Sequence, residues 1–149
     1  MPISAPDLTK RPPRSPRIRL GGYVLLPRMI DKGRATIVKK NGEFHYDCPL
    51  DQHFLKFAGI DAKKLKVQLA KGKGDGEILK WVIANSKTKP DFLKVLAWSE
   101  YQQNRVPSDL DSRKFLDNYH KKMGPKRTDI STWFDVLDLD DHVTFGGKA

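Results

Sequence analysis

Apolar residues recur at helical spacing along most of the chain, and turn-forming residues divide this pattern into segments. In the longest segment, residues 15–40, one face of a helix would carry Leu20, Tyr23, Val24, Leu26, Pro27, Ile30 and Ile37. The Gly21-Gly22 pair and Pro27 weaken a helix, so they predict a kink near residues 23–27 or two helices that meet there. We therefore expect a leading helical unit over residues 15–40.

Shorter helical segments follow this leading unit. The same spacing, bounded by capping residues and by Gly and Pro, predicts helices over residues 49–58, 62–71, 77–85, 88–98, 108–123 and 131–141. Strand signals are almost absent and no internal repeat is visible. The pattern therefore predicts an all-α fold, a single-domain bundle of about six to seven helices.

The first sixteen residues differ from the rest of the chain. Residues 1–16 contain five prolines and no apolar period, which is typical of an extended arm with polyproline character. The length of 149 residues suits one domain with a single core. We expect an extended Pro/Arg-rich N-terminal arm over residues 1–16 and a helical domain over residues 17–149.

The net charge of +10 is unevenly distributed. Residues 1–40 hold ten Lys and Arg against two Asp, whereas the last 21 residues hold five Asp against one Lys. The basic part could attract phosphates, or it could lie against the chain's own acidic C-terminus. A nucleic-acid-associated protein is therefore the alternative function, with backbone phosphates bound by the cations of the arm: Lys10, Arg11, Arg14, Arg17 and Arg19.

Several protein classes are disfavoured by composition and motifs. Cys48 is the only cysteine, so an internal disulfide is impossible, and the chain opens without a secretory leader pattern. No apolar run approaches the roughly twenty residues that span a bilayer. We expect a cytoplasmic protein with no membrane segment. The Gly- and Lys-rich stretch at residues 71–76 lacks the Gly-Lys-Ser/Thr of a phosphate loop, and we expect no cofactor.

Two charged residues interrupt the apolar face of the leading helix. Asp31 and Arg34 point into the apolar sector of the helical projection, whereas Arg28 and Lys32 point away from it. Charges turned toward a core must be paired or must open onto a cavity. One interpretation is a polar notch that binds a small anionic ligand or a protein partner through Tyr23, Asp31, Arg34 and Asp51. The other is a structural ion pair.

The densest group of metal-capable side chains follows the leading helix. His45, Cys48 and His53 could ligate zinc if the turn before residue 49 brought them together, although their spacing matches no standard motif. Cys48 could instead be a nucleophile with His45 or His120 as its base. A buried thiol beside two surface histidines explains the same residues. We expect no metal here, and the pattern leaves open whether any reaction is catalysed.

Several short motifs resemble those of a known family. The segments are Leu20-Gly21-Gly22-Tyr23-Val24, Pro27-Arg28, Asp31-Lys32, Arg34-Ala35, Cys48-Pro49-Leu50-Asp51 and Gly59-Ile60-Asp61. Together they resemble a family of small bacterial proteins catalogued only as a domain of unknown function. The resemblance implies a bacterial, stand-alone helical domain, and it implies no activity and no catalytic residues.

Overall fold

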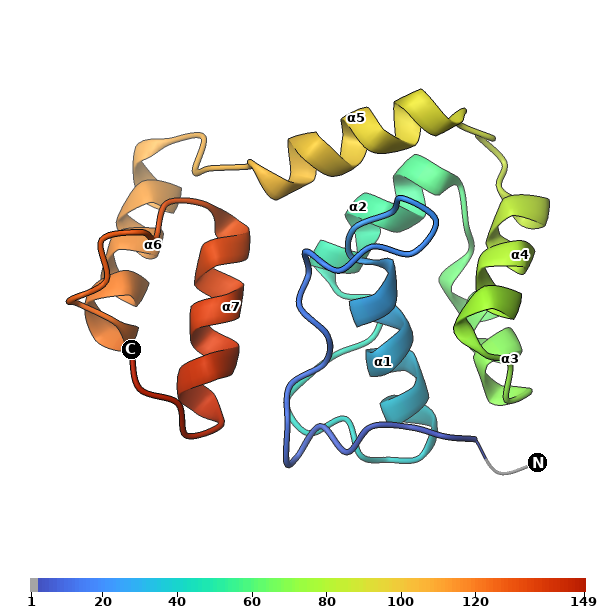
Figure 1. The fold of residues 1–149 in the computed structure, drawn as a ribbon, viewed down its shortest axis with the longest axis horizontal. Helices are drawn as coiled ribbons and strands as arrows, with labels where there is room; N and C mark the ends of the chain where they lie inside the picture. Colours follow the sequence, from blue (N-terminus) through green and yellow to red (C-terminus); the bar gives the residue numbers. More distant parts are fainter. Residues whose placement is uncertain (1–2) are drawn as a thin grey trace.

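The structure, a computed structural model, describes residues 3–149 and is all-helical (Figure 1). Seven α-helices and no sheet strand occur in this range, which confirms the prediction of an all-α single domain. The helices are α1 (Leu26–Ile37), α2 (Pro49–Ala58), α3 (Ala62–Ala70), α4 (Asp75–Asn85), α5 (Phe92–Gln103), α6 (Leu110–Met123) and α7 (Trp133–Thr144).

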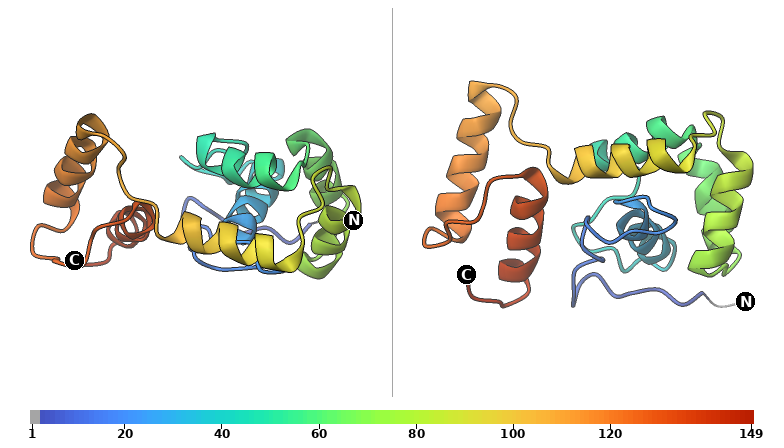
Figure 2. Two further views of the ribbon diagram at one scale, coloured as in Figure 1. Left: turned by 90° about the horizontal axis from the view of Figure 1, so that it is seen from above. Right: turned by 45° about the horizontal axis from the view of Figure 1, so that its top comes forward.

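The helices form two packed groups. Helices α1 to α4 pack together with one face of α5, and α5 leads across the top to α6 and α7 (Figures 1 and 2). These two helices lie side by side and run in the same direction, because the loop between them returns to the end of α5, and we call this pair with its loop the hairpin. The larger core contains Met29, Ile30, Phe54, Leu65 and Ile78 among others, whereas the hairpin has its own small core around Leu116 and Leu139. Phe134 of α7 packs on Val24 and Leu25 and so joins the two groups.

The leading helical unit is shorter than predicted. Residues 15–25 are not helical, so the predicted helix over residues 15–40 is wrong in its first half. Gly21 and Gly22 both have positive φ, as in a type I′ turn. The Leu20 and Tyr23 backbones exchange hydrogen bonds of 3.1 and 3.0 Å across that turn. The two glycines therefore reverse the chain instead of kinking a helix, and α1 begins one residue before Pro27.

Helix α1 is surrounded by other parts of the chain. At Gly33 an added Cβ would lie 2.5 Å from a methyl carbon of Leu69 in α3, so the two helices approach closely there. Arg28 and Lys32 are 4% and 3% exposed, so the prediction that they point away from the core is wrong. The helical projection assumed one solvent-facing side, and α1 has none at these positions because the arm, α2 and the hairpin cover them.

Residues 3–16 form an extended segment that runs along α1 (Figure 1). Leu8 is buried, and its N–H donates to the Lys40 carbonyl at 2.8 Å. The arm therefore takes part in the packing around α1. None of the helices in residues 3–149 is both long and apolar enough to cross a bilayer.

Candidate functional site

The predicted notch residues Asp31 and Arg34 both face inward, but toward charged partners. Asp31 is 8% exposed and accepts hydrogen bonds from the Arg14 backbone N–H, Nε and Nη2 at 2.9, 3.1 and 3.0 Å. Arg34 lies 3.0 Å from Asp75 and donates to the Lys73 carbonyl. Arg14 also pairs with Asp75 at 2.7 Å. These alternating charges satisfy one another, as a structural network does.

The other two residues of the predicted ligand site lie elsewhere. Tyr23 belongs to an aromatic cluster, with its ring centroid 5.1, 6.2 and 6.1 Å from those of Phe54, Phe57 and Trp98. Burial raises the pKa of the Tyr23 hydroxyl. Asp51 pairs with Lys32 instead of joining Asp31. The four predicted residues thus divide among three surroundings, and their role in ligand binding stays a prediction.

Lys32 and Asp51 form a buried ion pair where α1 meets the start of α2, and the half-buried Cys48 adjoins it. The Lys32 Nζ lies 2.8 Å from the Asp51 Oδ1 and 3.2 Å from the Cys48 Sγ. The second Asp51 oxygen accepts the Asp47 backbone N–H at 2.9 Å. The side chains of Lys32 and Asp51 are 4% and 1% exposed, so this ion pair is almost fully desolvated.

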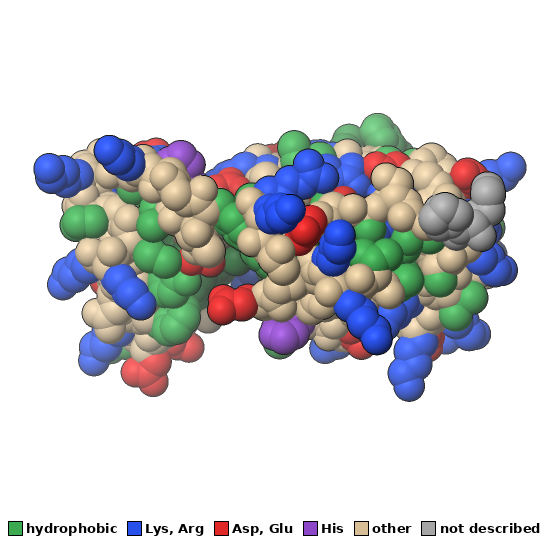
Figure 3. Space-filling model, turned by 90° about the horizontal axis from the view of Figure 1, so that it is seen from below, with side chains coloured by type: hydrophobic (Ala, Val, Ile, Leu, Met, Phe, Trp, Pro, Cys, Tyr) green, Lys and Arg blue, Asp and Glu red, His purple; other side chains and the backbone are tan. Residues whose placement is uncertain are grey.

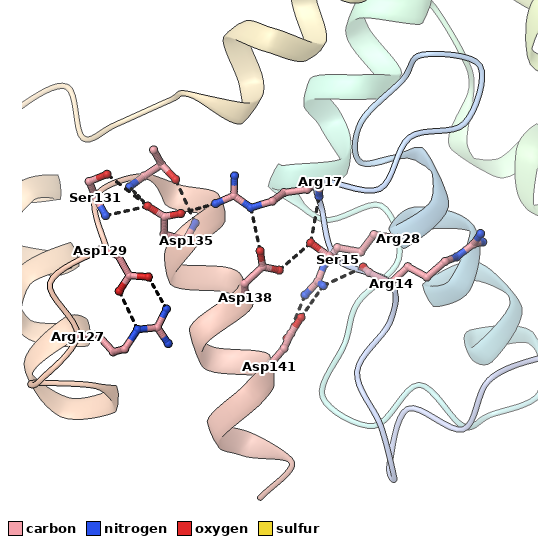
Figure 4. Close-up of polar contacts among 11 residues, drawn as sticks. Arg14, Ser15, Arg17, Arg28, Arg127, Asp129, Ser131, Asp135, Asp138 and Asp141 are labelled. Atoms are coloured by element: carbon pink, nitrogen blue, oxygen red, sulfur yellow. Dashed lines mark hydrogen bonds and ion pairs between the residues drawn. The ribbon is translucent and has the colours of Figure 1, made fainter. Parts of the chain in front are cut away.

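Arg28, one turn before Lys32, joins α1 to the hairpin. Its Nη1 donates to Asp141 at 2.7 Å and to the Arg14 carbonyl at 3.2 Å (Figure 4). Its guanidinium also lies over the Phe44 ring. The pKa of Asp141 is raised by burial first, and the charges of Asp138 and Asp140 add to this effect. Arg28 lowers it only in part. The carboxylate is therefore costly to ionise where it lies, and Arg28 is the group that compensates.

A cavity of about 820 Å³ separates the hairpin from α1 and α2, and we call it the hairpin cleft. Figure 3 shows the molecule hollowed between these two parts, with hydrophobic side chains inside the hollow. Arg28, Lys32 and Cys48 line one wall of the cleft. Its apolar lining comes from Leu8, Phe44, Leu50, Met123, Leu137 and Phe145. A smaller, mainly apolar pocket of about 330 Å³ adjoins it and shares Leu50 and Leu137.

The hairpin wall of the cleft carries one hydrogen-bonded acid. The Tyr119 hydroxyl donates to Asp140 Oδ1 at 2.8 Å, and Thr144 donates to the same oxygen at 3.3 Å. Burial, followed by this contact with Asp140, raises the pKa of Tyr119 to about 12. Tyr119 therefore stays protonated at neutral pH and continues to donate to Asp140.

The three metal-capable residues are not assembled into a site. His45 and Cys48 both line the hairpin cleft, whereas His53 faces Gln102, with 3.5 Å between their nitrogens. Within residues 3–149, no group of three or more His, Cys, Asp or Glu side chains is arranged to hold a metal ion. His120, the other base considered for Cys48, contacts the Arg127 carbonyl instead. The polar group that contacts the Cys48 Sγ is the Lys32 ammonium.

The basic arm docks on acidic groups of its own chain. Arg17 pairs with Asp135 and Asp138 of α7, and the Ser15 hydroxyl donates to Asp138 at 2.7 Å (Figure 4). Arg19 pairs with Glu100 of α5 at 2.7 Å. With Arg14 bound to Asp31 and Asp75, three of the five arm cations have internal partners. Lys10 and Arg11 are exposed and form no ion pair with the described residues.

Sequence similarity places the chain in a family. Residues 10–143 match the family model described as Domain of unknown function (DUF5069). The chain belongs to this family. The match runs from the arm to the penultimate residue of α7, so this DUF5069 domain includes both walls of the hairpin cleft. No curated protein matches the chain. The resemblance to a family of unknown function is thereby confirmed at the level of the family.

The hairpin cleft was missed at the level of the sequence, although one signal pointed to it. Arg28 and Lys32 stand four residues apart, so they lie on the same face of α1 as like charges. Like charges at this spacing on a central helix need separate counter-ions. Asp51 and Asp141 supply them from distant parts of the chain, and their identity cannot be read from local spacing.

Proposed function

We propose that this DUF5069 domain is a small-ligand-binding module and that the ligand binds in the hairpin cleft. The observation that carries the proposal is the cavity of about 820 Å³ between two packed groups of helices. Binding sites for small molecules are typically cavities of about 300–1,000 Å³ at such boundaries, mainly apolar and with a few buried polar groups. The cleft has this composition, with Arg28, Lys32 and Cys48 among apolar side chains.

The cleft supports ligand binding better than the notch around Asp31 and Arg34. At the notch, Arg14, Lys73 and Asp75 already provide partners for both charged groups. A ligand there would have to displace an intramolecular ion pair. In the cleft, the walls are formed but the volume between them is open. A small molecule also fits this concave shape better than a protein surface would.

Fluorescence of N-phenylnaphthylamine, an uncharged apolar probe, tests the proposal. Thr144 is exposed and lines the cleft, so Thr144→Trp narrows the cavity from the hairpin side. Ala97→Trp is the matched control, because Ala97 is exposed on α5 and does not line the cleft. We expect saturable probe binding that Thr144→Trp weakens by about tenfold, while Ala97→Trp leaves it unchanged. Equal binding by both variants would refute the cleft as the site.

A further inference from the structure

The hairpin cleft is lined by one member of each buried ion pair. Arg28 and Lys32 line the cavity, whereas their partners Asp141 and Asp51 do not. Asp51 is 1% exposed and lies behind Lys32, and Asp141 is 7% exposed beside Arg28. Although each pair is neutral as a whole, the wall therefore presents its positive ends to the cavity. A charge inside the cavity would be closer to the cations than to the carboxylates.

Lys32 also has an unused hydrogen-bond donor. An ammonium group carries three N–H groups. Asp51 and Cys48 accept two of them, and no other acceptor for Lys32 exists among residues 3–149. Because the Lys32 side chain is buried, a hydrogen bond from this ammonium to an anion would be charge-assisted and strong. The structure thus offers a nine-tenths-buried cation with a donor available on the cleft side.

The two acidic residues of the cleft, Asp140 and Glu43, restrict an anion to the wall formed by Lys32 and Arg28. Asp140 lies on the hairpin wall and already accepts hydrogen bonds from Tyr119 and Thr144. Glu43 lines the cleft from an exposed position in the loop before α2. The remaining lining is largely apolar or aromatic, including Phe44 and Phe145. A ligand that fits this lining combines an anionic group with an apolar body.

We infer that the hairpin cleft takes an anionic amphipathic small molecule. Its carboxylate, phosphate or sulfonate group binds Lys32 with support from Arg28, and its apolar body lies against the aromatic and aliphatic lining. This inference rests on the proposed function and adds the chemical class of the ligand. The cleft binds such a molecule through the cations of two ion pairs whose carboxylates do not line the cavity.

Two dyes that differ by one charged group provide the test. Anilinonaphthalene sulfonate carries a sulfonate that N-phenylnaphthylamine lacks. Lys32→Met combined with Asp51→Asn removes both charges of the buried pair and leaves the net charge of the chain unchanged. We expect this double variant to weaken sulfonate binding by about tenfold and N-phenylnaphthylamine binding by less than about twofold. Lys32→Gln, which keeps a donor for Asp51, provides a second variant and should show the same selective loss.

Arg34→Met is the matched control, because it removes a cation from the opposite side of α1. It should change the affinity of neither dye. If the Lys32 variants weaken both dyes equally, or neither dye, the ligand class is wrong while the proposed function stands on the uncharged probe. If N-phenylnaphthylamine does not bind the wild-type cleft, the proposed function fails and the ligand class fails with it.

Discussion

The Arg28–Asp141 pair should be the strongest single electrostatic link between α1 and the hairpin. Its side chains are 4% and 9% exposed, with 2.7 Å between Nη1 and Oδ2. Two unit charges about 4 Å apart interact by about 4 kcal/mol at an effective dielectric constant of about 20. Removing one partner of a buried pair costs about 3–5 kcal/mol, since the other charge is left desolvated. We therefore expect Arg28→Met and Asp141→Asn each to lower the free energy of unfolding by about 4 kcal/mol.

The two variants should differ in their dependence on pH. In Arg28→Met, the buried Asp141 has lost the cation that held its pKa down, so it can become neutral by taking up a proton as the pH falls. The penalty of this variant should shrink toward acid pH. Asp141→Asn has no carboxyl group at this position to protonate, whereas the pKa of Asp141 in wild type is raised on folding, so the penalty of this variant should rise toward acid pH and not shrink. Combining Arg28→Met with Asp141→Leu removes both charges and should cost less than either single substitution.

Urea unfolding at neutral and acid pH, followed by tryptophan fluorescence, measures these differences. Arg113 and Asp117 supply the control, because they form an exposed pair within α6, 3.1 Å apart. Arg113→Ala should cost less than about 0.5 kcal/mol. If Arg28→Met costs no more than Arg113→Ala, the hairpin is not held to α1 as described, and the cleft between them loses its wall.

Three further predictions concern the notch and the arm. The pKa of Asp75 is lowered, mainly by the Arg14 hydrogen bond, so wild type should lose more stability than Asp75→Asn as the pH falls below about 4. Asp75 is one-third exposed, so the two proteins should differ in this loss by less than about 1 kcal/mol, as measured by urea unfolding. If Asp75→Asn lost more stability than wild type as the pH falls, the prediction would be wrong. Arg34→Met should lower the free energy of unfolding by about 1–2 kcal/mol and should leave N-phenylnaphthylamine binding unchanged. If this variant no longer bound the probe, the result would support a ligand site at the notch. Lys10→Ala with Arg11→Ala should leave duplex DNA affinity unchanged at physiological salt, and a drop of about tenfold would support the nucleic-acid alternative.

Local signals predicted the helices well where a residue acts on its own neighbours. Pro49 begins α2 and Gly59 follows it with φ 64°, as the sequence suggested. Asp61 caps α3 through the Lys64 N–H, and Asp91 caps α5 in the same manner. Such caps need only contacts three residues apart, so they are visible in the sequence.

Prediction failed where the outcome depended on distant segments. The Gly21-Gly22 pair could kink a helix or reverse the chain, and the reversal is accompanied by a hydrogen bond from Leu25 to the Pro16 carbonyl. The prediction that Asp31 points inward was correct. Its partner Arg14 could not be predicted, because the arm has no apolar periodicity from which the position of Arg14 could be inferred. Lys32 was misplaced because no helical projection of α1 contains Asp51 of α2, which pairs with it.

Alkylation of Cys48 by iodoacetamide tests the central claim most directly. Cys48 is the chain's only cysteine and lines the hairpin cleft 3.2 Å from the Lys32 ammonium, so its reaction rate reports whether that wall is covered. Anilinonaphthalene sulfonate at about ten times its Kd should slow the reaction by about tenfold in the wild-type protein. It should slow the reaction only about twofold in the Lys32→Met, Asp51→Asn variant at the same concentration, because a tenfold weaker affinity leaves about half of that variant unoccupied. An alkylation rate that bound dye leaves unchanged would contradict a ligand site in this cleft.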